Sequence, residues 1–268
     1  GIFKGKEIEG VNFFSGSLEK DKVFQVGDKA LVTISYEGDV IKSAVISDHY
    51  RLNREFILMA AFVLLLILFA GKNGLQAIFS FAITVLSIWK ILVPCYLKGY
   101  SPVWIGIFIT IFLTAVIIFF VYGLDKRTLV AVLGALLGIF TTCILGIFFT
   151  NLFMIHGAIM PNAESLLYSG YEDLNLTAIF MSSIFIGASG AMMDLAVDIT
   201  SAVYEVTQKK PDITRWEAVK SGMNVGRAAM GTMTTTLLLA YSGGYVTLLM
   251  VFMAQGTPID HILNYKYV

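Results

Sequence analysis

Three acidic residues and a serine recur at helical spacing near the C-terminal end of the chain: Asp194, Asp198, Ser201 and Glu205. Steps of four, three and four residues place these side chains on one face of an α-helix. Ionisable residues inside a membrane are costly, at about 2.5 to 3.5 kcal/mol on insertion scales, and normally face protein or water. The pattern therefore predicts a site that binds and releases a proton or a cation.

The next apolar stretch carries a second polar stripe. Its members are Asn224, Arg227, Gly231, Thr234 and Thr235. An arginine within a span needs a partner, so we expect Arg227 to pair with Asp194 or Asp198 across two neighbouring helices. Moving the guanidinium by a few Å would then favour or disfavour the charged form of the carboxylates.

Small residues accompany both stripes: Gly187, Gly190, Ser201, Gly231, Thr234 and Thr235. They either line a path to the carboxylates or only allow helices to pack closely, a common use of small residues in membranes. We expect a kink at residues 187–190. The acidic stripe also has a plainer interpretation, because residues 194–205 at the membrane surface would form a solvated amphipathic face.

The composition requires a membrane to hold these helices. Of 268 residues, 57% are hydrophobic and 14% are charged, too few charged residues for the surface of a soluble domain. A span needs roughly 20 apolar residues. We expect about seven spans, near residues 56–70, 75–97, 102–122, 128–149, 174–206, 221–241 and 245–256. The fold class is thus an all-α polytopic membrane protein with a helical domain over residues 51–268.

The first 50 residues differ, being rich in Lys, Glu, Asp and Gly. Residues 29–35 alternate between apolar and polar side chains, residues 37–39 read as a turn, and a second short run follows at 40–45. This pattern predicts a β-hairpin in a small domain over residues 1–50. The chain begins with Gly inside a polar segment, so we expect this domain to be incomplete.

Basic residues suggest the orientation of the helices. The connections near Lys72, at residues 126–127 and at residues 209–220 hold seven basic residues. The alternate connections hold Lys98 against Glu164, Glu172 and Asp173. Since Lys and Arg accumulate in cytoplasmic loops, we expect the β-domain and residues 150–173 outside and residues 207–216 in the cytoplasm.

The sequence shows few signs of a metal, cofactor, nucleic-acid or catalytic site. His49, His156 and His261 have no ligand spacing, and Cys95 and Cys143 lie in apolar runs, so we expect no metal site and no cofactor. The net charge is zero without a basic tract, which argues against a nucleic-acid partner. No phosphate-binding loop or nucleophile motif is present, and we do not expect an enzyme.

Several motifs closely resemble the YibE/F family of multispanning bacterial membrane proteins: residues 26–28, 72–75, 163–167, 190–199, 221–227 and 230–234, with Glu205. This resemblance implies a protein of the bacterial cytoplasmic membrane with an extracytoplasmic N-terminal domain. It also implies a helix before the β-domain and another after Tyr265. The activity of that family is not established.

A fainter likeness of residues 190–244 is to the SecD/SecF and resistance-nodulation-division transporters, in which acids within the membrane relay protons. It rests on Asp194, Glu205, Arg227, Thr234 and Thr235. The additional spans and the very small external domain of this chain depart from that pattern.

These observations lead to two hypotheses on function. In the first, the chain is a secondary ion- or proton-coupled transporter or translocation component for an unknown small solute or ion. In the second, it is a non-transporting scaffold or accessory subunit, part of a homo-oligomer or bound to another membrane subunit. A water-accessible path to Asp194 would favour transport, whereas a dry, fully paired cluster would favour the scaffold.

Overall fold

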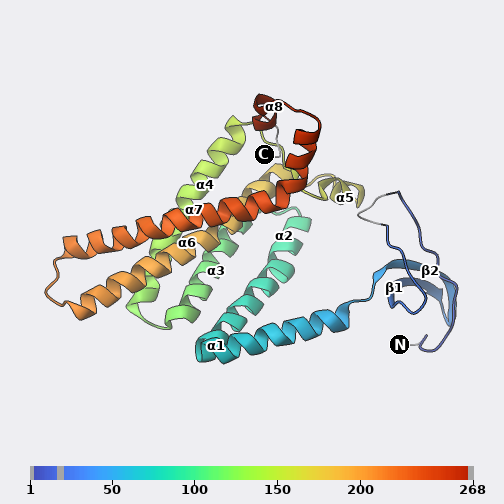
Figure 1. Ribbon diagram of the computed structural model, residues 1–268, viewed down its shortest axis with the longest axis horizontal. Helices are drawn as coiled ribbons and strands as arrows, with labels where there is room; N and C mark the ends of the chain where they lie inside the picture. The colour runs from blue at the N-terminus through green and yellow to red at the C-terminus, as the bar shows by residue number, and fades with distance from the viewer. Residues whose placement is uncertain (1–2, 17–20, 265–268) are drawn as a thin grey trace. The chain divides into compact units, whose positions relative to one another are not determined.

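The computed structural model describes residues 3–16 and 21–264 (Figure 1). The chain divides between Phe69 and Ala70 into two compact units. The first contains a β-hairpin and the beginning of a long helix, and the second contains the remaining helices.

Two antiparallel strands form the N-terminal hairpin that the alternating pattern predicts. β1 spans Ala30–Glu37 and β2 spans Val40–His49, with Glu37 opposite Val40 at the turn. Gly38 occupies the turn at a φ of 60°, a conformation that glycine adopts without a steric penalty. Val11 extends the hydrogen bonding along β2, because its amide donates to the Ala44 carbonyl at 2.9 Å.

The first long helix is interrupted at one glycine. α1 spans Leu52–Ser87, but Gly71 has a φ of 54° and a ψ of −124°, outside the helical region. The segment continues as a π-helical turn, η1 (Ile88–Leu92), and then α2 (Val93–Leu97). Pro94 lacks an amide hydrogen and cannot donate to the preceding turn, which accounts for the irregular turn before it. The expected spans 56–70 and 75–97 thus lie on either side of Gly71.

The middle of the chain follows the sequence pattern closely. α3 spans Pro102–Tyr122 and α4 spans Lys126–Leu152. The Asp125 side chain caps α4 by accepting from the Arg127 amide, which satisfies one of the free donors at the helix start. A 3-10 turn, η2 (Gly157–Ile159), and a short helix, α5 (Ala163–Tyr168), then lead to the second half.

Two long helices and one short helix complete the chain. α6 spans Leu176–Lys209, α7 spans Arg215–Ala254 and α8 spans Ile259–Leu263. α6 remains helical through residues 187–190, so the kink expected there is not a break in the helix. α7 is also continuous through residues 242–244, where we expected one span to end and another to begin. Small residues lower helix propensity there without ending the helix.

Five helical segments in the described ranges are long and apolar enough to cross a membrane: Leu52–Leu97, Pro102–Tyr122, Lys126–Leu152, Leu176–Lys209 and Arg215–Ala254. Their length and composition support a multi-pass membrane protein. The count differs from the expected seven because two pairs of expected spans each fall within one of these five segments. Leu52–Leu97 contains the break at Gly71, and Arg215–Ala254 contains none.

α6 is the central helix of the second unit, since it contacts α3, α4 and α7. Phe185 is fully buried against Ile139 and Cys143 of α4. Met193 packs in the cluster that contains Ile118 of α3. α7 runs beside α6 from the turn that joins them (Figure 1). α6 therefore presents each of its faces to a different neighbour, and those neighbours determine what surrounds its acidic residues.

Candidate functional site

Two glycines bring α7 into close contact with α6. A Cβ at Gly222 would lie 2.7 Å from Val203 Cγ2, and a Cβ at Gly226 would lie 2.9 Å from Ile199 Cδ1. A step of four residues along α7 thus matches a step of four backwards along α6. The two helices are antiparallel in a defined register, and glycine is what permits this distance.

This register places the two polar stripes at the same height along the helices. Arg227 is level with Asp198, and Gly231 is level with Asp194. At 100° per residue, however, residues 224, 227 and 231 lie on the side of α7 away from Gly222 and Gly226. Asn224 and Arg227 are exposed there. The stripes therefore lie at similar heights, but the polar face of α7 is turned away from α6 instead of towards Asp194 and Asp198.

The direct ion pair expected for Arg227 does not form. Neither Asp194 nor Asp198 is among the carboxylates that pair with a cation in residues 3–16 and 21–264. Arg227 has no carboxylate partner in the same ranges. The physical reason is the rotation of α7 about its own axis, which the two contact glycines impose.

Asp194 and Asp198 instead line a common cavity of about 310 Å³. Its other lining residues are apolar and come from α3, α6 and α7: Ile117, Ile118, Val121, Met193, Val197 and Met233. Both carboxylates are exposed to this space. Two acids one helical turn apart in apolar surroundings repel each other when both are ionised, so a shared proton or cation lowers the energy of the cavity.

The remaining members of the α6 stripe have other neighbours. Glu205 is exposed, and its Oε1 accepts from Lys209 Nζ at 2.5 Å, one helical turn further along. Ser201 is held by Tyr122 of α3: the Tyr122 hydroxyl donates to the Val197 carbonyl at 2.6 Å and lies 2.6 Å from Ser201 Oγ. Neither Glu205 nor Ser201 lines the cavity.

A cluster around Arg127 joins the C-terminal end of α3 to the C-terminal part of α6. The sequence did not predict this cluster. The Arg127 guanidinium lies 4.3 Å from the ring centre of Tyr204 and 5.1 Å from that of Tyr122. Its Nη2 atom pairs with Asp125 Oδ2 at 2.7 Å, and this hydrogen-bonded cation holds the pKa of Asp125 below its usual value. The spacing of Tyr122 and Tyr204 is unremarkable in the sequence. A cation between two aromatic faces links the turn between α3 and α4 to α6.

Two buried hydroxyls lie on α3, closer to its start than the residues of this helix that line the cavity. Thr110 and Thr114 are 1% and 0% exposed, and neither hydroxyl has a hydrogen-bond partner among the described residues. Further along, the Tyr96 hydroxyl hydrogen-bonds to Ser182 of α6. Buried hydroxyls without partners are uncommon because they lose their hydration. These two are suited to contact water or a polar solute.

Ser201 contacts Tyr122 of α3, but the three glycines proposed from the sequence touch no other helix among the described residues. A Cβ at Gly187, Gly190 or Gly231 would meet no atom within 4 Å. The hydroxyls of Thr234 and Thr235 donate to carbonyls of their own helix at 2.8 and 3.1 Å. Their use in lining a path remains a prediction.

Metal ligands do not converge in the described part of the chain. Over residues 3–16 and 21–264, no group of three or more His, Cys, Asp and Glu side chains could hold a metal ion. Asp194 and Asp198 alone supply two acidic side chains, which suits a proton or a weakly held cation better than a resident transition metal.

Most of the chain matches one known protein family. The family model for YibE/F-like proteins matches residues 58–268. The chain belongs to this family. No curated protein and no solved structure matches the chain significantly. The matched residues of this YibE/F-like chain include the cavity, the cluster around Arg127 and all of α7, whereas the β-hairpin lies outside the match.

Proposed function

We propose that this YibE/F-like chain is a secondary transporter that couples movement of an unknown small solute or ion to a proton or another cation. One observation carries the proposal: Asp194 and Asp198 share a cavity, and neither forms an ion pair with a basic residue in the described part of the chain. Carboxylates used only as structural ion pairs would each have a cation. Unpaired carboxylates facing a space in a membrane helix are available for exchange.

The physical basis is the energy of two like charges in apolar surroundings. Binding one proton or one cation removes the repulsion between Asp194 and Asp198, and release restores it. The hydroxyls of Thr110 and Thr114 support a polar route that continues from the cavity between α3 and α6. If the cavity opened alternately to the two sides of the membrane, binding on one side and release on the other would produce transport.

The test compares coupled flux with protein abundance in liposomes that contain the full-length protein and a pH-sensitive dye. Asp194→Asn and Asp198→Asn preserve side-chain size and hydrogen bonding, so we expect normal insertion and no coupled flux. Glu205→Gln is the matched control, because Glu205 is exposed and pairs with Lys209 outside the cavity. Its flux should equal that of the wild type.

Two results would contradict the proposal. Wild-type flux in well-folded Asn variants would show that the carboxylates do not exchange the coupling ion. Equal loss of flux in Glu205→Gln would show that acidic charge on α6 matters in general, not at the cavity. Measurements with sodium and potassium gradients identify the coupling ion, and a solute panel addresses the substrate.

A specific observation also supports a scaffold as the second candidate. The polar face of α7, which carries Asn224, Arg227 and Gly231, points away from α6 and is exposed in a single chain. An exposed arginine within a span is costly in lipid, so this face suits contact with another membrane helix. Arg227→Gln should then reduce co-purification of a partner subunit or of a tagged second copy while leaving the flux of isolated chains unchanged.

The same proposal includes an orientation in the bacterial cytoplasmic membrane, with the β-hairpin outside. The contacts of Arg127 with Tyr204 bring the basic turn between α3 and α4 next to the end of α6 that leads to Lys209. Glu164, Glu172 and Asp173 belong to the connection that precedes α6 at its other end. This separation of charge supports a cytoplasmic location for the turn between α6 and α7.

A further inference from the structure

A second cavity lies in the first unit, at the open end of the hairpin. β1 begins and β2 ends there, and the Tyr50 amide donates to the Lys29 carbonyl at 2.7 Å. The cavity has a volume of about 380 Å³, within the range of small-molecule sites. It is lined by residues of the segment before β1, the end of β2 and the start of α1: Gly27, Asp28, Lys29, His49, Tyr50, Arg51, Asn53 and Arg54.

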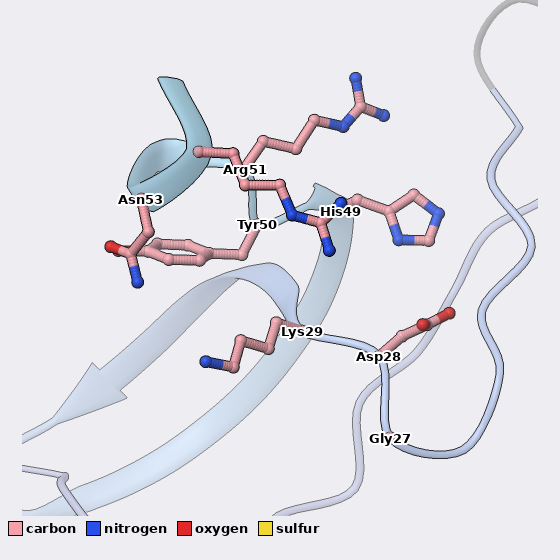
Figure 2. A pocket seen from close by; sticks show the side chains of 8 residues that line it. Gly27, Asp28, Lys29, His49, Tyr50, Arg51 and Asn53 are labelled. Carbon is pink, nitrogen blue, oxygen red and sulfur yellow. The ribbon is translucent and has the colours of Figure 1, made fainter. Parts of the chain in front are cut away.

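The lining is basic, and most of its positive charge is not neutralised. Arg51 pairs weakly with Asp48, at 3.3 Å, whereas Lys29 and Arg54 have no ion pair with any described residue. Asp28 does not compensate for Lys29, because the two side chains point in opposite directions (Figure 2). The Asp28 carboxylate instead accepts a hydrogen bond from the backbone N–H of Gln25 at 2.8 Å. The cavity therefore presents an excess of cationic donors.

The cavity lies at the N-terminal end of α1, where this membrane helix would meet the membrane surface. Arg51 immediately precedes α1, and Arg54 lies in the first turn of the helix. Glu55 follows Arg54 in the same turn, and the uncharged residues 56–70 begin after it. A helix with this order places its basic end at the level of the phospholipid headgroups when its apolar part is in the hydrocarbon.

We propose that this cavity binds a phosphate group, supplied by an anionic phospholipid headgroup. The planar guanidinium groups of Arg51 and Arg54 match the oxygen geometry of phosphate, and Lys29 adds a point charge. The Tyr50 hydroxyl and the Asn53 amide line the same cavity and can donate to the glycerol part of a headgroup. The site is separate from the cavity at Asp194 and does not depend on the proposed transport.

The test measures binding of fluorescently labelled phosphatidylglycerol to the purified full-length protein in detergent. Lys29→Gln and Arg54→Gln should each raise the Kd about fivefold, and the double variant about twentyfold, because each removes one cation near the bound phosphate. Lys4→Gln is the matched control, since Lys4 is an exposed lysine of the same unit that does not line the cavity. Its Kd should equal that of the wild type.

Competition distinguishes the two sources of phosphate. Displacement by unlabelled phosphatidylglycerol, but not by millimolar inorganic phosphate or glycerol phosphate, supports the lipid. Full displacement by inorganic phosphate supports the phosphate site and assigns it to a soluble anion, which overturns the lipid assignment. Wild-type affinity in a double variant with a normal size-exclusion profile would overturn the site itself.

Discussion

At the scale of single residues, the buried hydroxyls of Thr110 and Thr114 provide a test of whether the helix interface around them is dry or hydrated. Neither has a hydrogen-bond partner among the described residues, and valine has nearly the same shape as threonine. If the interface is dry, Thr114→Val removes an unsatisfied group and should stabilise the protein by about 1 kcal/mol. If water follows this route to Asp194, the same variant should lower coupled flux.

Thermal unfolding in detergent and flux in liposomes measure these two effects independently. Ser183→Ala is a suitable control, because Ser183 is exposed and donates to a carbonyl of its own helix at 2.7 Å. A stabilised Thr114→Val variant with unchanged flux would remove the hydroxyls from the route.

The ion pair of Asp125 with Arg127 predicts a specific dependence on pH. Hydrogen bonds from Arg127 lower the pKa of Asp125 in the folded protein. Its contribution to stability is therefore present above the unfolded-state pKa, about 4, and is lost as the pH falls through the lower folded-state value. Between roughly pH 5 and pH 3, Asp125→Asn should lose less thermal stability than the wild type. Equal losses in both proteins would show that other carboxyl groups determine the acid sensitivity.

At the scale of elements, the contact of α6 with α7 depends on two glycines. A side chain at residue 222 would lie 2.7 Å from Val203, so Gly222→Val should destabilise the protein by about 1 to 3 kcal/mol through overpacking. Gly231→Val is a matched control on the same helix, because a Cβ there meets nothing within 4 Å. Comparing their unfolding temperatures tests the register. Greater destabilisation by Gly231→Val would favour the orientation first expected from the sequence.

The difference between predicted and observed faces of α7 has a physical cause. Helical periodicity alone was sufficient to place Asp194 and Asp198 on one face of α6, and the structure places both in one cavity. Periodicity does not determine which face of a neighbouring helix is turned inward. In lipid, faces that contact protein and faces that contact the bilayer are both apolar, so hydrophobicity could not rank Gly222 and Gly226 above Gly231.

Contacts between residues far apart in the chain could not be predicted from the sequence either. The hairpin could be predicted because its strands are adjacent and their alternation is local. Tyr122 and Tyr204 meet Arg127 only after α3, α4 and α6 have packed. Nothing in their local sequence distinguishes these tyrosines from the other aromatic residues of the spans. The continuous helix through residues 242–244 likewise shows that small residues weaken a helix without necessarily ending it.

At the scale of the whole molecule, the orientation in the membrane determines which end of the Asp194 cavity faces which compartment. Three connections, near Lys72, Lys126 and Lys209, carry basic residues, and the connection before α6 carries acidic ones. Arg51 and Arg54 lie at the end assigned to the outside, and they oppose this orientation. The assignment therefore depends on the number of basic residues in the short connections, which hold seven.

Single-cysteine labelling of intact cells tests this orientation. Cys95 and Cys143 are replaced first, and one cysteine is then introduced at Ser165 or at Gln208. A membrane-impermeant thiol reagent should label the cysteine at 165, in α5, and spare the one at 208, near the end of α6. Permeabilised cells provide the control, since both positions should react there. Labelling at 208 but not at 165 in intact cells would reverse the orientation, place the β-hairpin in the cytoplasm and invert the direction in which the cavity is loaded.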